Sequence, residues 1–199
     1  MKKKPLYLFV LGLGALWLAG CSPNVIESGE FYTQWDRQGG CQSGDTTPWG
    51  PAVTGEPVSA CQFPGQYVWV FYGAKWCTSS NRQTPAFVRF TKEAAENTVY
   101  LSVVTGGPKV FTQPTQEDIA SWARHYGLPP ERVVAELSDY TIPGTNYQPG
   151  RVVPQHALIG PQGNTLFRYL GRLSQEEMRD ILADFQQGRR TPTLASPST

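Results

Sequence analysis

The feature that most constrains the fold is an apolar run that passes directly into a single cysteine and then into a helical pattern. Residues 67–72 are apolar and β-prone, so they predict a buried strand. Trp76 and Cys77 follow the run, Ser80 stands three residues after the cysteine, and Pro85 lies further along the helical segment. This layout predicts one thiol displayed where a strand turns into a helix.

The first twenty residues are typical of a signal peptide. Residues 2–4 are lysines, and the apolar run at 6–19 is shorter than the roughly 20 residues that a spanning helix needs. Residues 18–21, Leu-Ala-Gly-Cys, resemble the lipobox of bacterial lipoproteins, which implies cleavage before Cys21 and a lipid on its sulfur. By the same resemblance Ser22 favours the outer membrane. The alternative is a plain signal peptide with an incidental cysteine.

Composition places the remaining chain in one domain with tails. Without the three N-terminal lysines, 14 of the 17 basic residues remain, compared with 16 acidic residues. This near-neutral balance with no basic cluster argues against nucleic acid as a partner. We expect a signal peptide at 1–20, a polar tether at 21–50, a folded domain at 51–187 and a disordered tail at 188–199.

The periodicity alternates between strand and helix across the domain. Two capping boxes mark helix starts, one at Thr115 with Asp118 and one at Ser174 with Glu177. This order predicts an α/β fold, with a central mixed sheet covered by helices on both faces. The predicted strands are 67–72, 99–105, 152–159 and 165–170, and the predicted helices are 79–96, kinked at Pro85, 115–126 and 174–185.

These features together resemble the TlpA-like group of periplasmic, membrane-anchored thioredoxins, from about residue 55 to residue 185. The resemblance implies a thioredoxin-like fold and thiol–disulfide exchange with protein thiols and disulfides, without a cofactor or metal. The segments that carry it are Gly55-Glu56-Pro57-Val58, Phe63-Pro64-Gly65-Gln66-Tyr67-Val68, Trp76-Cys77 with Pro85, Val153-Pro154, and Gly160-Pro161-Gln162-Gly163.

Two positions depart from that family. Ser80 stands where the family has its second, resolving cysteine, and Phe71 stands where thioredoxins usually carry a buried acid. That acid assists proton transfer when the second thiol attacks, so the two losses are consistent with each other. They fit either specialisation to one thiol or decay of the redox function.

Cys77 is predicted at a helix N-terminus. Unpaired backbone N–H groups and the helix dipole favour an anion there, and the thiolate is the nucleophilic form of cysteine. Lys75 adds a positive charge if its side chain turns toward the sulfur, and Ser80, one turn on, has a hydroxyl to donate. The resemblance also implies that Trp76 is exposed beside the thiol. The alternative is an inert cysteine on a degenerate fold.

The resemblance further implies a substrate groove beside the thiol. It implies a cis peptide bond before Pro154, with the backbone of Val153 pairing with an extended client segment. An ordinary trans proline at a strand start is the alternative. The loop at 145–151 leads into this proline, and its Tyr147 and Arg151 are candidate client contacts.

Cys41 and Cys61 predict a structural disulfide, because a lipoprotein domain works where disulfides persist. Such a bridge contributes about 3 kcal/mol in the loop-closure model. The alternative is that one of them resolves Cys77. Cys61 is the better candidate for that role, because it precedes the strand that delivers Cys77.

Other chemistries fit less well. Peroxiredoxins place Thr or Ser three residues, and Pro seven residues, before their reactive cysteine, and here those positions hold Ala74 and Val70. Copper chaperones of related fold use two cysteines and a distant histidine, whereas this site has one cysteine. His156 follows Pro154 closely, so it either acts near the thiol or is a satisfied histidine within a strand. His125 is expected on a helix surface.

Two function classes therefore remain open. The first is a monomeric, membrane-anchored enzyme that performs monothiol thiol–disulfide exchange through Cys77. The second is a binding module that holds an extended segment in the Pro154 groove without redox turnover.

Overall fold

The computed structural model describes residues 28–44, 46, 48–93, 96–110, 112–136 and 152–192. Six strands form one mixed sheet in the order β1-β8-β7-β4-β5-β6, and β2 and β3 form a separate two-stranded sheet. The strands are β1 (Gly29–Glu30), β2 (Gly50–Pro51), β3 (Pro57–Val58), β4 (Tyr67–Ala74), β5 (Thr98–Gly106), β6 (Val133–Ala135), β7 (Gln155–Ile159) and β8 (Thr165–Leu170). The α-helices are α1 (Gln34–Arg37), α2 (Thr78–Lys92), α3 (Gln116–Tyr126) and α4 (Gln175–Gln186), and the 3-10 turns are η1 (Gly40–Ser43), η2 (Ala60–Gln62) and η3 (Pro130–Arg132).

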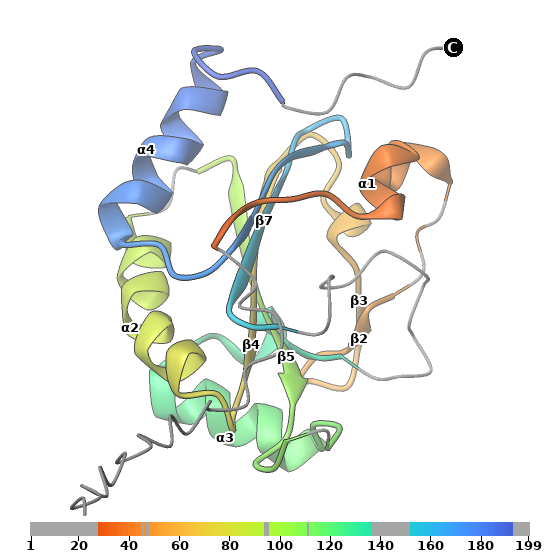
Figure 1. The fold of residues 1–199 in the computed structure, drawn as a ribbon. Coiled ribbons are helices and arrows are strands. Elements are labelled where there is room, and N and C mark those ends of the chain that lie inside the picture. Colours follow the sequence, from red (N-terminus) through yellow and green to blue (C-terminus); the bar gives the residue numbers. More distant parts are fainter. Residues whose placement is uncertain are drawn as a thin grey trace, which may run out of the picture.

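Strand β4 lies in the middle of the sheet, paired parallel with β5 and antiparallel with β7. Strand β6 continues the parallel half beyond β5. Because β5 and β6 are added on the same side, right-handed crossovers place α2 and α3 on one face. Helix α4 covers that face too, while α1 and the β2–β3 pair lie on the other (Figure 1). The predicted mixed sheet with helices on both faces is confirmed.

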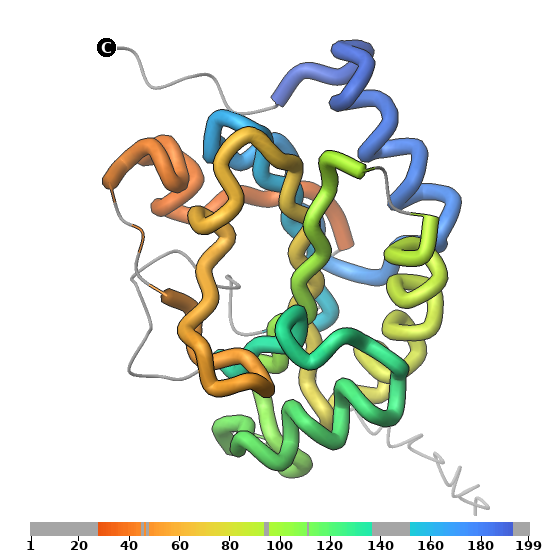
Figure 2. The backbone as a smooth tube through the Cα atoms, turned by 180° about the vertical axis from the view of Figure 1, so that it is seen from behind, coloured from red at the N-terminus to blue at the C-terminus, as the bar shows by residue number. Residues whose placement is uncertain are grey.

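Side chains of β4 alternate between two cores. Trp69 and Phe71 pack under α2, α3 and α4, whereas Val70 and Tyr72 face the N-terminal part of the chain. On that second side the ring of Trp49 lies 5.9 Å from the ring of Tyr72. Figure 2 shows the segment before β4 running across this face. Both faces of the central strand are therefore buried, as an uninterrupted apolar run requires.

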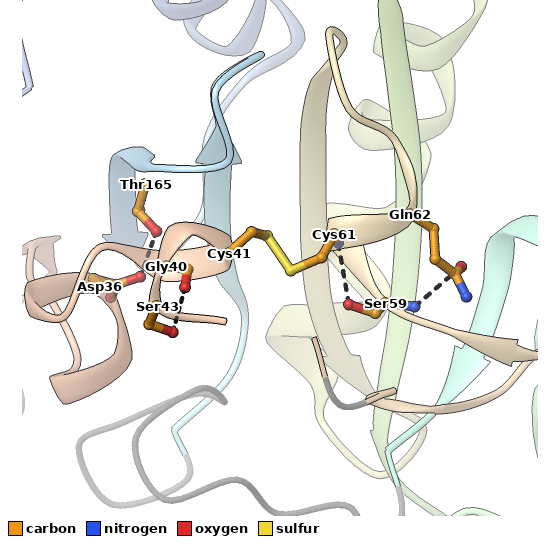
Figure 3. Close-up of a disulfide and its surroundings, with 8 residues drawn as sticks. All are labelled: Asp36, Gly40, Cys41, Ser43, Ser59, Cys61, Gln62 and Thr165. Atoms are coloured by element: carbon orange, nitrogen blue, oxygen red, sulfur yellow. Dashed lines mark hydrogen bonds between the residues drawn. A yellow bond between two sulfur atoms is a disulfide. The ribbon is translucent and has the colours of Figure 1, made fainter. Parts of the chain in front are cut away.

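The segment before residue 50 is part of the domain, so the predicted tether is wrong over its described part. Strand β1 pairs with β8, and α1 begins with a capping box between Thr33 and Asp36. A disulfide joins Cys41 to Cys61 (Figure 3). The Cys41 N–H also donates to the carbonyl of Gly163 at 2.9 Å. The predicted signal peptide and lipidation site lie outside the described residues.

A buried ion pair holds this segment against the sheet. Two nitrogens of Arg168 lie next to the Asp36 carboxylate, with Nε 2.8 Å from Oδ2 and Nη2 2.9 Å from Oδ1. Neither side chain is exposed. Thr165 donates to the same carboxylate at 2.5 Å. Burial alone would raise the pKa of Asp36, but the Arg168 charge and these hydrogen bonds outweigh it and hold that pKa below its usual value. The carboxylate is therefore charged in the folded protein.

The chain after α4 also begins by packing on the domain. Arg190 pairs with Glu30, and its guanidinium lies 5.0 Å from the centre of the Phe167 ring. The predicted tail at 188–199 is therefore held to the domain at its start, and residues 193–199 lie outside the described part.

Helix boundaries follow their capping signals. Thr115 and Ser174 both cap as predicted, and Gly127 ends α3 in the left-handed conformation, with φ of 66°. Helix α2 ends at Lys92, earlier than the predicted residue 96, and it includes Pro85. Strand β7 begins only after Pro154, because the cis Val153–Pro154 peptide bond precedes it.

The buried pair predicts a large loss of stability when one partner is neutralised. Asp36→Asn keeps the shape of the side chain but leaves Arg168 buried without its counter-charge, so we expect the free energy of unfolding to fall by about 3–5 kcal/mol. Chemical denaturation measures this loss. The matched control is Glu117→Gln, which breaks the exposed pair with Arg124 and should change stability by less than about 0.5 kcal/mol. Equal small effects in both variants would contradict the assigned role of the buried pair.

Candidate active site

Cys77 stands at the junction of β4 and α2. The turn is closed by the Cys77 N–H, which donates to the Ala74 carbonyl at 3.0 Å, and by the Lys75 N–H, which donates to the Gly106 carbonyl at 3.2 Å. Cys77 is the N-cap of α2, with extended backbone angles, and its side chain makes no cap hydrogen bond. The first-turn N–H groups thus lack a side-chain acceptor at the cap, and the positive end of the helix lies next to the sulfur.

The thiol meets the segment that precedes β7. Cys77 Sγ donates to the carbonyl of Val153 at 3.3 Å, and Cys77 is 8 % exposed. The peptide bond between Val153 and Pro154 is cis, as predicted. These two residues, predicted to form the client groove, therefore lie beside the cysteine. Tyr147 and Arg151, the other predicted groove residues, lie outside the described residues.

Ser80 is buried in the first turn of α2. Its Oγ has no hydrogen-bond partner among the described residues, and its carbonyl accepts a bond from the Thr84 hydroxyl at 2.8 Å. The hydrogen bond from Ser80 to the Cys77 sulfur that the sequence suggested is not formed. The thiol donates a hydrogen bond to the Val153 carbonyl. A buried hydroxyl without a partner costs about 1–3 kcal/mol, so this position carries a local energetic cost.

Lys75 is paired with helix α3, and the condition that the sequence left open, a side chain turned toward the sulfur, is not met. Its Nζ lies 2.7 Å from Oδ1 of Asp118 and 2.9 Å from Oγ of Ser121, both on α3. Burial tends to raise the pKa of Asp118, but the hydrogen bond from Lys75 and those from Thr115 lower it below its usual value. Lys75 therefore links the turn between β4 and α2, which carries Cys77, to helix α3. Its charge is paired with the Asp118 carboxylate.

Trp76 is exposed beside the thiol, as the resemblance implied, with 36 % of its surface accessible. Its indole rests on Gly106, where an added Cβ would lie 2.7 Å from Nε1. A β-bulge at the ends of β4 and β5 sets Gly106 opposite Ala74. The missing side chain at Gly106 thus leaves room for the indole.

Sequence reasoning missed Asn81 and Tyr126. The Asn81 side-chain amide donates to the carbonyls of Lys75 and Cys77, and its Oδ1 accepts a hydrogen bond from Tyr126 at 2.8 Å. Asn81 lies four residues after Cys77, the N-cap of α2, and is therefore one helical turn away from it. This spacing is the sequence signal that could have indicated the contact. The partner on α3 gave no such signal, because it lies 45 residues further along the chain.

Phe71 and His156 lie beneath α2, on the face of the sheet opposite to the core that contains Cys77. Phe71 stands at the position of the missing acid. Its ring packs at a tilt against Phe87, with ring centres 5.0 Å apart, and against His156, with ring centres 5.4 Å apart. His156 is fully buried and its Nδ1 accepts from Trp69 Nε1 at 3.3 Å. Burial lowers the pKa of His156 to about 3, so the imidazole is neutral. It is a core histidine rather than a partner of the thiol.

The disulfide lies at the other end of the sheet from Cys77. Cys41 and Cys61 have Cα atoms 5.5 Å apart, and both line a cavity with Val68 and Ile159, at the start of β4 and the end of β7. Strand β4 spans eight residues, or about 26 Å, before it delivers Cys77. Cys61 is therefore too far from Cys77 to resolve it. Cys61 precedes β4 and lies at the start of that strand, whereas Cys77 follows the end of the strand.

In the part of the chain that the structure describes, no helix is long and apolar enough to cross a bilayer. The same part contains no group of three or more histidine, cysteine, aspartate or glutamate side chains placed to hold a metal ion.

No protein-family model matches the chain, and no curated protein matches its sequence. Solved structures do match. A thiol:disulfide interchange protein from Chlorobium tepidum is 18 % identical, with a TM-score of 0.51, over 69 % of this chain and 94 % of that one. A DsbF homologue from Corynebacterium diphtheriae is 11 % identical, with a TM-score of 0.54, over 82 % and 96 %.

The exposed lipoprotein thioredoxin of Streptococcus pneumoniae is 20 % identical, with a TM-score of 0.50, over 67 % of this chain and 96 % of that one. At these identities the likeness concerns the fold. The chain therefore has a thioredoxin-like fold, as predicted.

The buried Ser80 hydroxyl predicts a variant that is more stable but less reactive. Ser80→Ala removes the unpartnered oxygen, so the free energy of unfolding should rise by about 1 kcal/mol more than in Ser79→Ala, which changes only the helix propensity of an exposed neighbour. Alkylation of Cys77 by iodoacetamide should slow in Ser80→Ala if the hydroxyl serves the thiolate. A loss of stability in Ser80→Ala would show that the hydroxyl has a partner in the folded protein.

Proposed function

We propose that the chain is a membrane-anchored, extracytoplasmic thioredoxin-like protein that performs monothiol thiol–disulfide exchange through Cys77. The observation that carries this proposal is the meeting of a helix N-cap cysteine with the Val153 carbonyl before a cis proline. Cys77 is also the one free cysteine among the described residues. A single nucleophilic sulfur beside a strand-like edge suits attack on the disulfide of an extended client.

The reaction proceeds in two balanced steps. The Cys77 thiolate attacks one sulfur of a client disulfide, the client S–S bond breaks, and a Cys77–client disulfide forms while the other client sulfur leaves as a thiolate. A second thiolate, from the client or from a small thiol, then attacks the mixed disulfide and releases Cys77. When the second thiol belongs to the client, the client ends with a rearranged disulfide. When it is a small thiol, the attacked client sulfur ends in a disulfide with it and the other client sulfur ends as a thiol.

The neighbouring residues take defined parts in this scheme. The thiol leaves the Val153 carbonyl when it ionises, and the Ser80 hydroxyl then has an anion to which it can donate. Val153 and Pro154 shape the groove in which the client backbone lies, and Tyr147 and Arg151 are candidate client contacts from their sequence positions alone. Trp76 covers the client segment next to the reacting sulfur.

Location in the bacterial envelope is part of the proposal. The lipobox-like sequence supports a lipid on Cys21, and Ser22 favours the outer membrane, with the domain facing the periplasm. The Cys41–Cys61 disulfide fits an oxidising compartment, where such bonds persist. One structure of similar fold is described as an exposed lipoprotein thioredoxin.

A second candidate is a binding module that holds an extended segment at Pro154 without redox turnover. Two observations favour it. The Cys77 thiol is largely buried and is already engaged with Val153, and Phe71 fills the place of the acid that serves a dithiol cycle.

A peptide with one cysteine in disulfide linkage to a small thiol separates the two candidates. The parent protein should form a Cys77–peptide disulfide that persists without reductant, because Ser80 cannot expel the peptide. Ser80→Cys should release the peptide thiol and form an internal disulfide between positions 77 and 80.

Ser79→Cys is the matched control, since it adds a thiol one residue out of place on the exposed side of the turn. Its peptide adduct should persist as in the parent. Intact mass and peptide mapping follow all three proteins. Tight peptide binding with no adduct in the parent would support the binding module instead.

A further inference from the structure

Asn81 ties together the turn that carries the reactive cysteine. Its Nδ2 donates to the carbonyl of Cys77 at 2.8 Å and to the carbonyl of Lys75 at 3.0 Å. The Asn81 backbone N–H donates to the same Cys77 carbonyl at 3.0 Å. Both lone pairs of that carbonyl are thereby used. One side chain therefore fixes the carbonyl groups of the two residues that flank Trp76.

Tyr126 fixes the direction in which the Asn81 amide faces. The Tyr126 hydroxyl donates to Asn81 Oδ1 at 2.8 Å. If the amide were reversed, Oδ1 would face two carbonyl oxygens, which are acceptors and have no hydrogen to share. The bond from Tyr126 therefore reinforces the orientation in which Nδ2 points at the turn.

Helix α3 thus holds the cysteine turn at two points. One is the ion pair of Lys75 with Asp118, which Ser121 supports. The other passes from Tyr126 through Asn81 to the Cys77 carbonyl. Neither connection involves a sulfur atom, so the turn is held in the same way whatever the redox state of Cys77.

We propose that Asn81 is a positioning residue for Cys77, with Tyr126 acting through it. This inference rests on the proposed exchange function. Attack on a disulfide needs the sulfur held at the correct place and angle, and orientation of this kind contributes strongly to rates. The turn fixed by Asn81 keeps Sγ beside the Val153 carbonyl, where the client backbone is proposed to lie. Alkylation by a small, freely diffusing reagent has no such requirement for a docked partner.

The test compares two reactions of the same sulfur. The first is attack on a peptide whose cysteine is linked to thionitrobenzoate, which Cys77 expels while forming the peptide disulfide. The second is alkylation by iodoacetamide at the same pH. The ratio of the two rate constants cancels any change in the fraction of thiolate. Tyr126→Phe should lower this ratio about three- to tenfold, the range expected for loss of one hydrogen bond. Asn81→Ala removes three hydrogen bonds and should lower the ratio at least as far.

A double variant separates positioning from general packing of α3. In the Asn81→Ala background, Tyr126→Phe should lower the ratio no further, because its effect passes through the missing amide. Tyr67→Phe is the matched control, since it removes a tyrosine hydroxyl bonded to the Phe185 carbonyl far from the turn, and it should leave the ratio unchanged.

Two outcomes would overturn the inference: ratios within twofold of the parent value in both single variants, or an equal effect of Tyr126→Phe in the two backgrounds. Failure of the exchange function would look different. The parent itself would then form no peptide disulfide, although iodoacetamide still labelled Cys77.

Discussion

The register between β4 and β7 is the constraint on which the candidate site depends. The two strands are antiparallel, with Tyr72 opposite Gln155, so the end of β4 lies beside the beginning of β7. Cys77 follows β4 and Val153 precedes β7, and the pairing therefore brings residues 76 positions apart within hydrogen-bond distance. A slip of one residue would turn every side chain of β4 to the wrong core, so the two buried faces lock this register. The position of the thiol is thus set by packing of the whole sheet rather than by the turn alone.

The site combines features that favour a reactive sulfur with features that restrain it. The uncapped N-terminus of α2 offers a place for an anion, whereas the Val153 carbonyl accepts a hydrogen bond from the neutral thiol. The Ser80 hydroxyl is buried without a partner beside them. This arrangement fits a thiol that is held at the Val153 carbonyl until a client displaces that contact. The disulfide at the far end of β4 stabilises the domain and cannot take part in this chemistry.

Local sequence signals predicted most of the fold, and long-range contacts account for what they missed. The apolar run of β4 and the capping boxes at Thr115 and Ser174 act within a few residues, so a sequence pattern shows them. Asp36 finds its partner Arg168 132 residues away, and a polar, glycine-rich segment therefore looked like a tether. The direction of Lys75 depends on Asp118, 43 residues away, which no pattern around the cysteine reveals. The cis Val153–Pro154 bond was predicted through the family resemblance, because a proline by itself does not specify its isomer.

The central claim is that Cys77 exchanges disulfides without a second sulfur in its own chain. Its most direct test is mass mapping of every cysteine in protein taken from the cell envelope, with free thiols blocked at once by alkylation and no reductant added. The account predicts three results: a client or small-thiol disulfide on a fraction of Cys77, a Cys41–Cys61 bridge in all molecules, and a lipid on Cys21. A bond between Cys61 and Cys77, or Cys77 carrying only the alkylating agent in every molecule, would contradict it.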